Sequence, residues 1–177
     1  MDKIGFSKPV KLVIGFIAKE DMLIEKAKGV LEKKFGPIDF QSNVRDFDFT
    51  TYYNDELGEE LKRRFISFKK LIKIENAHII KVLTNRLEAK FSIRGQRRIN
   101  IDPGYISLSK LVLFTTKDFY HRIYLGKGIY AEVTLYYKDK TFRPFEWSYP
   151  DYRTVEYIEF FNGLREDYKV RLRHIKC

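Results

Sequence analysis

The pattern of apolar and polar residues predicts a strand and then a helix at the start of the chain. Residues 11–18 form an apolar run rich in branched side chains, which is typical of a strand buried on both faces. Between residues 19 and 35 the apolar side chains recur at helical spacing, and Gly36-Pro37 ends that pattern. We therefore expect a strand over 11–18 and a helix over 19–35.

The next two segments predict a pair of strands. Residues 41–53 alternate with a period of two, so Asp46 and Asp48 fall on one side of the expected strand. Residues 54–58 are turn-like. The segment 61–72 fits a helical face as well as an alternating strand, and we favour a strand that forms a hairpin with the previous one.

The middle of the chain predicts a helix and a short strand. Apolar residues recur at helical spacing over 75–91. Residues 98–101 indicate a strand that ends at Asp102-Pro103-Gly104, because Pro fixes φ and Gly permits a positive φ. The apolar segment 108–116 fits either type of element.

The last third predicts three strands and a closing helix. Two strands, 121–125 and 129–137, flank Gly126-Lys127-Gly128, which is a hairpin signature. A third strand follows over 141–145, and the segment 154–176 is an amphipathic helix. With no internal repeat or linker, the pattern predicts one α+β domain over residues 1–177, in which about three helices pack against a mainly antiparallel sheet.

Composition argues against a membrane protein. Charged residues make up 33% of the chain, and no apolar run is long enough to cross a bilayer. The N-terminus lacks the pattern of a secretory signal, and the single cysteine, Cys177, has no second cysteine with which to form a disulfide. We therefore expect a cytoplasmic protein with no membrane partner, and the sequence leaves its oligomeric state open.

Positive charge is concentrated in the centre of the chain. The protein carries 34 Lys and Arg against 24 Asp and Glu, a net charge of +10, and the excess within residues 62–98 equals that value. A basic segment with interleaved phenylalanines is typical of a surface that binds the phosphates of RNA. The residues expected to contact such a ligand are Arg63, Arg64, Lys69, Lys70, Arg97, Arg98 and, beyond the segment, Tyr105. The alternative is a solvated face whose cations neutralise the acidic segment at residues 20–61.

A second group of residues has the chemistry of a catalytic site. Lys117 and Arg122 are suited to bind a phosphate, His121 to transfer a proton at neutral pH, and Glu132 to orient that histidine from across the hairpin. Asp102 is a further carboxylate that points into a cleft in this interpretation. The alternative is a histidine at a strand edge among surface ion pairs, with an aspartate that caps a turn.

The sequence gives little support for a cofactor. Asp46 and Asp48, about 7 Å apart along a strand, could hold a divalent cation if another segment supplied further oxygens, and the alternative is a plain solvent face. The chain has no P-loop and no Rossmann glycine motif, so the usual phosphate cradles of nucleotide-binding folds are missing. The cofactor stays unknown.

Several strings of residues together resemble an uncharacterised prokaryotic family, domain of unknown function 4416. The resemblance covers about residues 10–162, and the helix after it extends to residue 177. It is carried by Lys11–Gly15, Phe47–Thr50 with Tyr52–Tyr53, Asn100–Tyr105, Thr115–Asp118 with His121–Leu125, Gly128–Glu132 and Trp147–Arg153. The resemblance implies that the polar positions of these strings are the place to look for a site.

Three functions remain open at this point. The favoured one is a protein that binds a phosphate-bearing ligand, most plausibly RNA, through the basic central segment. The second is an enzyme that acts on a phosphorylated or nucleotide substrate in a cleft lined by His, Lys, Arg and carboxylate side chains. The third is a protein-interaction module. If the motif residues meet in a concavity, the second interpretation gains.

Overall fold

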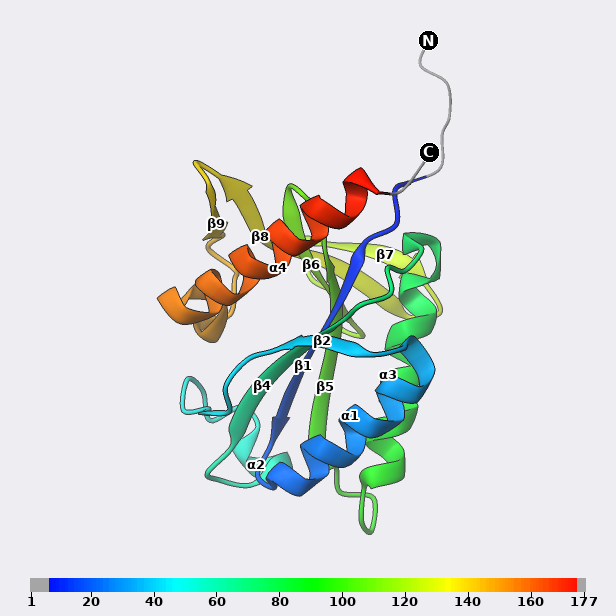
Figure 1. Cartoon of the computed structure of the whole chain (residues 1–177). Helices are drawn as coiled ribbons and strands as arrows, with labels where there is room; N and C mark the ends of the chain where they lie inside the picture. The colour runs from blue at the N-terminus through cyan, green and yellow to red at the C-terminus, as the bar shows by residue number, and fades with distance from the viewer. Residues whose placement is uncertain (1–6, 175–177) are drawn as a thin grey trace.

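The computed structural model describes residues 7–174, which form a nine-stranded sheet covered by helices on both faces (Figure 1). The strands are β1 (Lys11–Ala18), β2 (Ile38–Gln41), β3 (Arg45–Asp46), β4 (Lys62–Phe68), β5 (Ile99–Ile106), β6 (Lys110–Thr115), β7 (Arg122–Gly126), β8 (Ile129–Lys138) and β9 (Thr141–Pro144). The helices are α1 (Asp21–Phe35), α2 (Asn54–Leu57), α3 (Ala77–Phe91) and α4 (Val155–Arg173), with single 3₁₀ turns at Ile74–Asn76 and Pro150–Arg153. The main path of the sheet is β2-β4-β1-β5-β6-β8-β7, while β3 pairs with β4 and β9 with β8.

Strand β1 lies at the centre of two hydrophobic layers. Its even-numbered residues, such as Leu12 and Phe16, pack against helices α1 and α3, whereas Val13 faces the cluster that includes Phe161 of α4. Figure 1 shows α1 and α3 together on one face of the sheet and α4 across the other. Because alternate side chains enter opposite layers, β1 is buried along its whole length, as a run of branched apolar residues requires.

Most of the expected elements are confirmed. The strand over 11–18, the helices over 19–35 and 75–91 and the three strands after residue 120 lie within one to three residues of their expected positions. The ambiguous segment 61–72 contains strand β4, which pairs antiparallel with β2 and β3 before it in the chain. The undecided segment 108–116 contains strand β6, and the expected end of the last helix, at 175–176, lies outside the described residues.

The continuous strand expected over 41–53 is wrong. In this part of the chain only the short strands β2 and β3 pair with β4, and beyond Asp46 the chain leaves the sheet as a loop that leads into α2. Phe47 is buried in a small cluster with Ile17 and Leu61, and Tyr53 packs at its edge. Burial of these aromatic rings beneath the loop outweighs the strand preference of the alternating pattern, because tertiary packing decides such segments.

The turn expected at Asp102-Pro103-Gly104 is also wrong, because β5 runs straight through these residues. Glycine is required at position 104 because the backbones of β5 and β6 approach each other closely there, and not because φ is positive. A Cβ atom on residue 104 would lie 2.3 Å from the carbonyl oxygen of Val112 on β6. Pairing between β5 and β6 begins only at Gly104, directly after Pro103, which has no amide hydrogen to donate. The first half of β5 therefore pairs with β1 alone, and its other edge is left open.

None of the helices within residues 7–174 is long and apolar enough to cross a bilayer.

Candidate functional site

A pocket of about 640 Å³ opens where β5 and β6 stop pairing. Its walls come from the loop between β3 and β4, from β4, α3, β5 and β6, and from the segment that precedes α4. It is lined by Ile17, Phe47, Phe49, Thr50, Tyr52, Tyr53, Arg63, Lys81, Asn85, Glu88, Arg97, Asn100, Asp102, Leu113, Phe114, Thr115, Thr116, Lys117, Arg122, Glu132, Tyr149, Pro150, Asp151 and Tyr152. Its volume is within the usual range for sites that hold small organic ligands.

Side chains from α3 satisfy the open edge of β5. The Nζ atom of Lys81 donates to the carbonyl oxygen of Ile101 at 2.9 Å, and the amide of Ile101 donates to Oε1 of Glu88 at 2.6 Å. These two groups replace the strand partner that β6 does not provide, since buried backbone groups must be paired. Burial raises the pKa of the Glu88 carboxyl, and the nearby charge of Lys81 opposes that shift. The pocket can thus stay open without orphaned backbone atoms at Ile101.

A buried arginine lies beneath the floor of the pocket. Only 2% of the Arg63 side chain is exposed, and its Nη2 atom donates to the Tyr152 hydroxyl at 2.8 Å. Its Nε atom lies 3.2 Å from Oδ2 of Asp151, and its Nη1 atom lies 3.5 Å from Oδ2 of Asp102. Burial acts to lower the pKa of Arg63, but Tyr152 and the two aspartates outweigh it and raise that pKa. Burial raises the pKa of Asp151, and the nearby charge of Arg63 opposes that shift.

Asp102 is the carboxylate of the pocket that a ligand can reach. Its side chain is 24% exposed, against 7% for Glu88, 3% for Asp151 and 2% for Glu132. The Nδ2 atom of Asn100 donates to Oδ2 of Asp102 at 2.6 Å, and Nζ of Lys81 lies 3.6 Å from its Oδ1. Cations and an amide thus orient this carboxylate, which lines the pocket.

A second polar group is centred on Arg122, at the other side of the pocket. The Nε atom of Arg122 donates to Oε2 of Glu132 at 2.9 Å, while Nη1 donates to the carbonyl oxygen of Lys117 and Nη2 to the Tyr149 hydroxyl, each at 3.1 Å. Glu132 is buried and also contacts Nε2 of His121 at 2.9 Å. These contacts fix the plane of the Arg122 guanidinium and leave one hydrogen on each terminal nitrogen for a ligand.

Aromatic rings form the opposite wall. Phe49 and Tyr52 are partly exposed on the loop between β3 and β4, and Tyr53 lies 5.0 Å from Tyr52 between ring centroids. The Nζ atom of Lys117 contacts the Tyr52 hydroxyl and lies 4.2 Å from the centre of its ring. Burial, with the negative charge of Asp102 next, raises the pKa of Tyr53, so this tyrosine stays neutral. The pocket therefore combines flat apolar surfaces with cations.

The structure brings together many of the residues that the sequence singled out. Asp102, Lys117, Arg122 and Glu132 line the same pocket, and so do Arg63 and Arg97 from the basic segment. His121 lies behind Glu132, outside the lining. A concavity lined by motif residues is the arrangement expected of a small-molecule site.

Other predicted residues lie elsewhere. Arg64 pairs with Glu25 and Arg98 with Glu20, on the surface near α1, while Lys69 and Lys70 are exposed beyond the end of β4. Tyr105 is buried in a cluster where its ring packs on Phe114.

The expected pair of aspartates does not lie on one strand face. Asp46 ends β3, and Asp48 lies in the loop after it; both are exposed and outside the pocket. Within residues 7–174, no three His, Cys, Asp or Glu side chains are grouped as metal ligands.

Sequence reasoning missed the contribution of α3 and of the aromatic loop. Within the sequence Lys81 and Glu88 are two charges of the segment 62–98, and nothing local shows that they pair with the backbone of β5. Phe47, Tyr52, Tyr149 and other aromatic lining residues belong to the strings that carry the family resemblance. Their presence in these strings is the feature of the sequence that marks them as candidate site residues.

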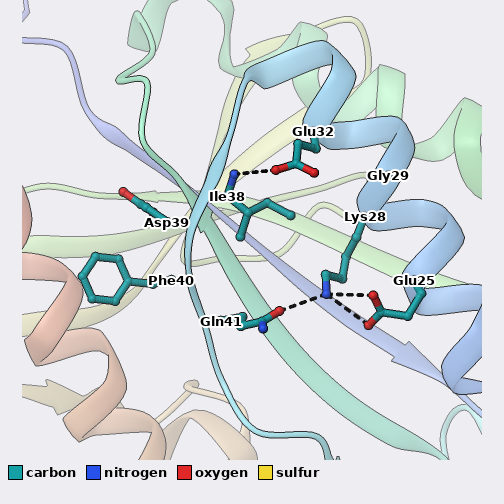
Figure 2. Close-up of a pocket in the computed structure, with 8 residues that line it drawn as sticks. All are labelled: Glu25, Lys28, Gly29, Glu32, Ile38, Asp39, Phe40 and Gln41. Atoms are coloured by element: carbon teal, nitrogen blue, oxygen red, sulfur yellow. Dashed lines mark hydrogen bonds and ion pairs between the residues drawn. The ribbon is translucent and has the colours of Figure 1, made fainter.

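A second, smaller hollow lies between α1 and β2, with a volume of about 380 Å³ (Figure 2). Its polar groups are largely paired with one another: Lys28 donates to Glu25 and Gln41, and the amide of Ile38 donates to Glu32. It offers less unpaired polar chemistry to a ligand than the larger pocket.

The fold and the pocket together define a small α+β protein with a ligand-sized cavity beside its central strands. The family model for a domain of unknown function (DUF4416) matches residues 8–168, and the chain belongs to this family. The resemblance noted in the sequence is therefore confirmed. No curated protein and no solved structure matches the chain significantly, so function has to be argued from the pocket itself.

Proposed function

We propose that this protein binds a small phosphorylated organic molecule, of about the size of a nucleotide, in the pocket between β5 and β6. The observation that carries the proposal is the convergence of Lys117, Arg122 and Asp102 in one cavity of about 640 Å³ beside aromatic rings. Each part of a nucleotide-sized ligand finds complementary chemistry there. RNA binding along the basic segment stays a prediction.

The phosphate is assigned to Arg122 and Lys117. A guanidinium held by Glu132, Tyr149 and a backbone carbonyl is preorganised, and its free hydrogens suit the oxygens of a phosphate. Lys117 is exposed and supplies a second positive charge, which Tyr52 holds at the aromatic wall. Arg122 and Lys117 together carry more positive charge than Glu132 neutralises, so this side of the pocket favours an anion.

The remainder of the ligand is assigned to the aromatic wall and to Asp102. Rings such as Phe49, Tyr52 and Tyr149 offer flat apolar surface to a base or another planar group. Asp102, the most exposed of the four pocket carboxylates, accepts hydrogen bonds from hydroxyl or amino groups. If the protein is an enzyme, Asp102 is the group that can take a proton from the substrate, and His121 acts only through Glu132 and Arg122.

The ion pairs of other basic residues favour the pocket, rather than the basic segment 62–98, as the place where phosphate binds. Arg64 and Arg98 are paired with acidic side chains of α1 or its N-cap, and Arg97 with Glu56 and Glu88. Cations that already have carboxylate partners release fewer counterions on binding nucleic acid.

The test compares phosphorylated molecules with their dephosphorylated counterparts. Calorimetric titration should give binding for at least one of the four ribonucleoside 5′-monophosphates, and at least tenfold weaker binding for its nucleoside. Lys117→Ala should reduce the affinity for the phosphorylated member of the pair but not for the nucleoside. Lys138→Ala, an exposed lysine outside the pocket, is the matched control and should change neither. Equal effects of the two lysine variants would remove Lys117 from the proposed site, and failure of every monophosphate to bind would end the proposal.

A further inference from the structure

Two exposed aromatic rings lie just outside the pocket. Phe119 and Tyr120 precede β7 and are 57% and 74% exposed, with ring centroids 5.0 Å apart. We call this pair the aromatic shelf. Large exposed apolar side chains that are adjacent and in contact usually mark a binding surface.

The aromatic shelf packs edge-on against His121, which stacks on Trp147. Both shelf rings contact the His121 imidazole, at 5.4 and 4.9 Å between centroids, and that imidazole is bonded to Glu132. His121 in turn stacks on Trp147 at 4.9 Å with an angle of 14° between planes. Trp147 donates its indole hydrogen to the carbonyl oxygen of Val133 at 2.9 Å. The shelf is therefore a preorganised surface, which lowers the entropy lost when a ligand stacks on it.

The shelf is continuous with the cationic side of the pocket. The guanidinium carbon of Arg122 lies 6.0 Å from the centre of the Phe119 ring, and Arg122 also lines the pocket. Lys117 lies two residues before Phe119 in the chain and lines the same pocket. The two cations thus stand between the cavity and the exposed rings. Asp118, which is also exposed there, and Glu132, which is buried against Arg122, are neighbouring charges that oppose an anion.

This order of groups matches a chain of nucleotides. In a single-stranded nucleic acid a phosphate joins each nucleoside to the next. Proteins bind such strands with cations along the backbone and aromatic rings stacked on the bases. We infer that the ligand is the 3′ end of a single-stranded oligonucleotide: its terminal nucleotide enters the pocket, the 5′-phosphate that joins this nucleotide to the chain contacts Arg122 and Lys117, and the preceding base stacks on Phe119 or Tyr120. The inference rests on the proposed function and extends it from a mononucleotide to an oligonucleotide end.

The test is a comparison of two ligand lengths in wild type and in a shelf variant. The probes are the four ribonucleoside 5′-monophosphates and the 5′-phosphorylated single-stranded tetranucleotides of the same bases, titrated by calorimetry. At least one tetranucleotide should bind more than fivefold tighter than its monophosphate, because one stacked base adds about 1 kcal/mol. Phe119→Ala/Tyr120→Ala should bring the two affinities within twofold while leaving the monophosphate affinity unchanged.

Control variants distinguish the loss of the aromatic shelf from the general effect of removing an exposed aromatic ring. Phe40→Ala removes a partly exposed phenylalanine from β2, at the opposite end of the sheet path, and should leave the fivefold ratio intact (Figure 2). If the double alanine variant does not fold, Phe119→Leu and Tyr120→Leu retain apolar volume but remove the stacking faces.

Trp147 is the single tryptophan of the chain, and its ring lies 6.4 Å from that of Tyr120. Its fluorescence should therefore change with the tetranucleotide more than with the monophosphate.

The outcomes are distinguishable. If no nucleotide of either length binds, the proposed function fails and this inference fails with it. If monophosphates bind but tetranucleotides bind no tighter, or if the shelf variants do not change the ratio, only the inference is overturned. An octaproline peptide in the same assay covers the other ligand class that uses aromatic surfaces; peptide binding that depends on the shelf, without a length effect for nucleotides, also overturns it.

Discussion

Replacement of the buried Arg63 by methionine should destabilise the protein far more than the same change at its neighbour Arg64. Arg63 has 2% of its side chain exposed and pairs with Asp151, which is 3% exposed, whereas Arg64 pairs with Glu25, which is 53% exposed. Removal of one partner from a buried pair leaves an uncompensated charge and costs about 3–5 kcal/mol. Removal of a partner from an exposed pair costs about 0–1 kcal/mol. Arg63→Met and Arg64→Met are therefore matched in chemistry and in strand but not in burial.

The assay is equilibrium unfolding in urea at 25 °C, with the midpoint and the slope measured for wild type and each variant. A third variant, Arg63→Met/Asp151→Leu, removes both buried charges and should recover most of the loss, since an apolar pair of similar volume is often as stable as a buried ion pair. Two results would contradict a stabilising role of the buried ion pair. One is a loss of unfolding free energy in Arg63→Met no larger than in Arg64→Met, and the other is a double variant that is less stable than Arg63→Met alone.

Further changes test the open edge of β5 and the packing around it. Gly104→Ala should destabilise the protein by about 1–3 kcal/mol, because its Cβ would lie 2.3 Å from the Val112 carbonyl oxygen; Gly163→Ala, in α4 with open space around it, should stabilise by about 0.5–1 kcal/mol. Urea midpoints that move in the same direction for both glycines would contradict this. Burial raises the pKa of Glu88 above its ordinary value of 4.5, so the folded state binds more protons than the unfolded state just above that value, and the free energy of unfolding should fall as pH rises through this window. Glu88→Gln should weaken that fall in urea titrations between pH 4.5 and 7, and an unchanged pH dependence would show that Glu88 is not its source.

The elements that the sequence predicts well are those whose pattern agrees with their final surroundings. Strand β1 is apolar on both sides because helices cover both faces, and α3 carries its apolar stripe toward that layer. The two wrong predictions share a cause: contacts made by residues distant in sequence. Phe47 leaves the alternating pattern to pack on Leu61, and Gly104 is required by the backbone of Val112 rather than by a turn.

The site was predictable in part for similar reasons. Lys117, Arg122 and Glu132 lie on one hairpin and its approach, so short-range pattern places them near one another. The pairing of Lys81 and Glu88 with Ile101 depends on the position of α3 beside an open strand edge, which no local pattern reveals. The sequence predicts Arg63 as a cation of a phosphate-binding surface, yet it is buried in the lining of the pocket, because charge counting does not distinguish a buried arginine from a solvated one.

NMR chemical-shift mapping distinguishes the proposed binding of phosphate-bearing ligands in the pocket from binding along the basic segment. A ¹⁵N-labelled sample would be titrated with the ribonucleoside 5′-monophosphates, followed by a mixed RNA pool. Monophosphates should shift the amide signals of Asp102, Thr116 and Lys117, which line the pocket, and leave those of Lys69 and Lys70 unchanged. Shifts confined to Lys69, Lys70 and their neighbours, or no shift with any monophosphate, would contradict binding in the pocket.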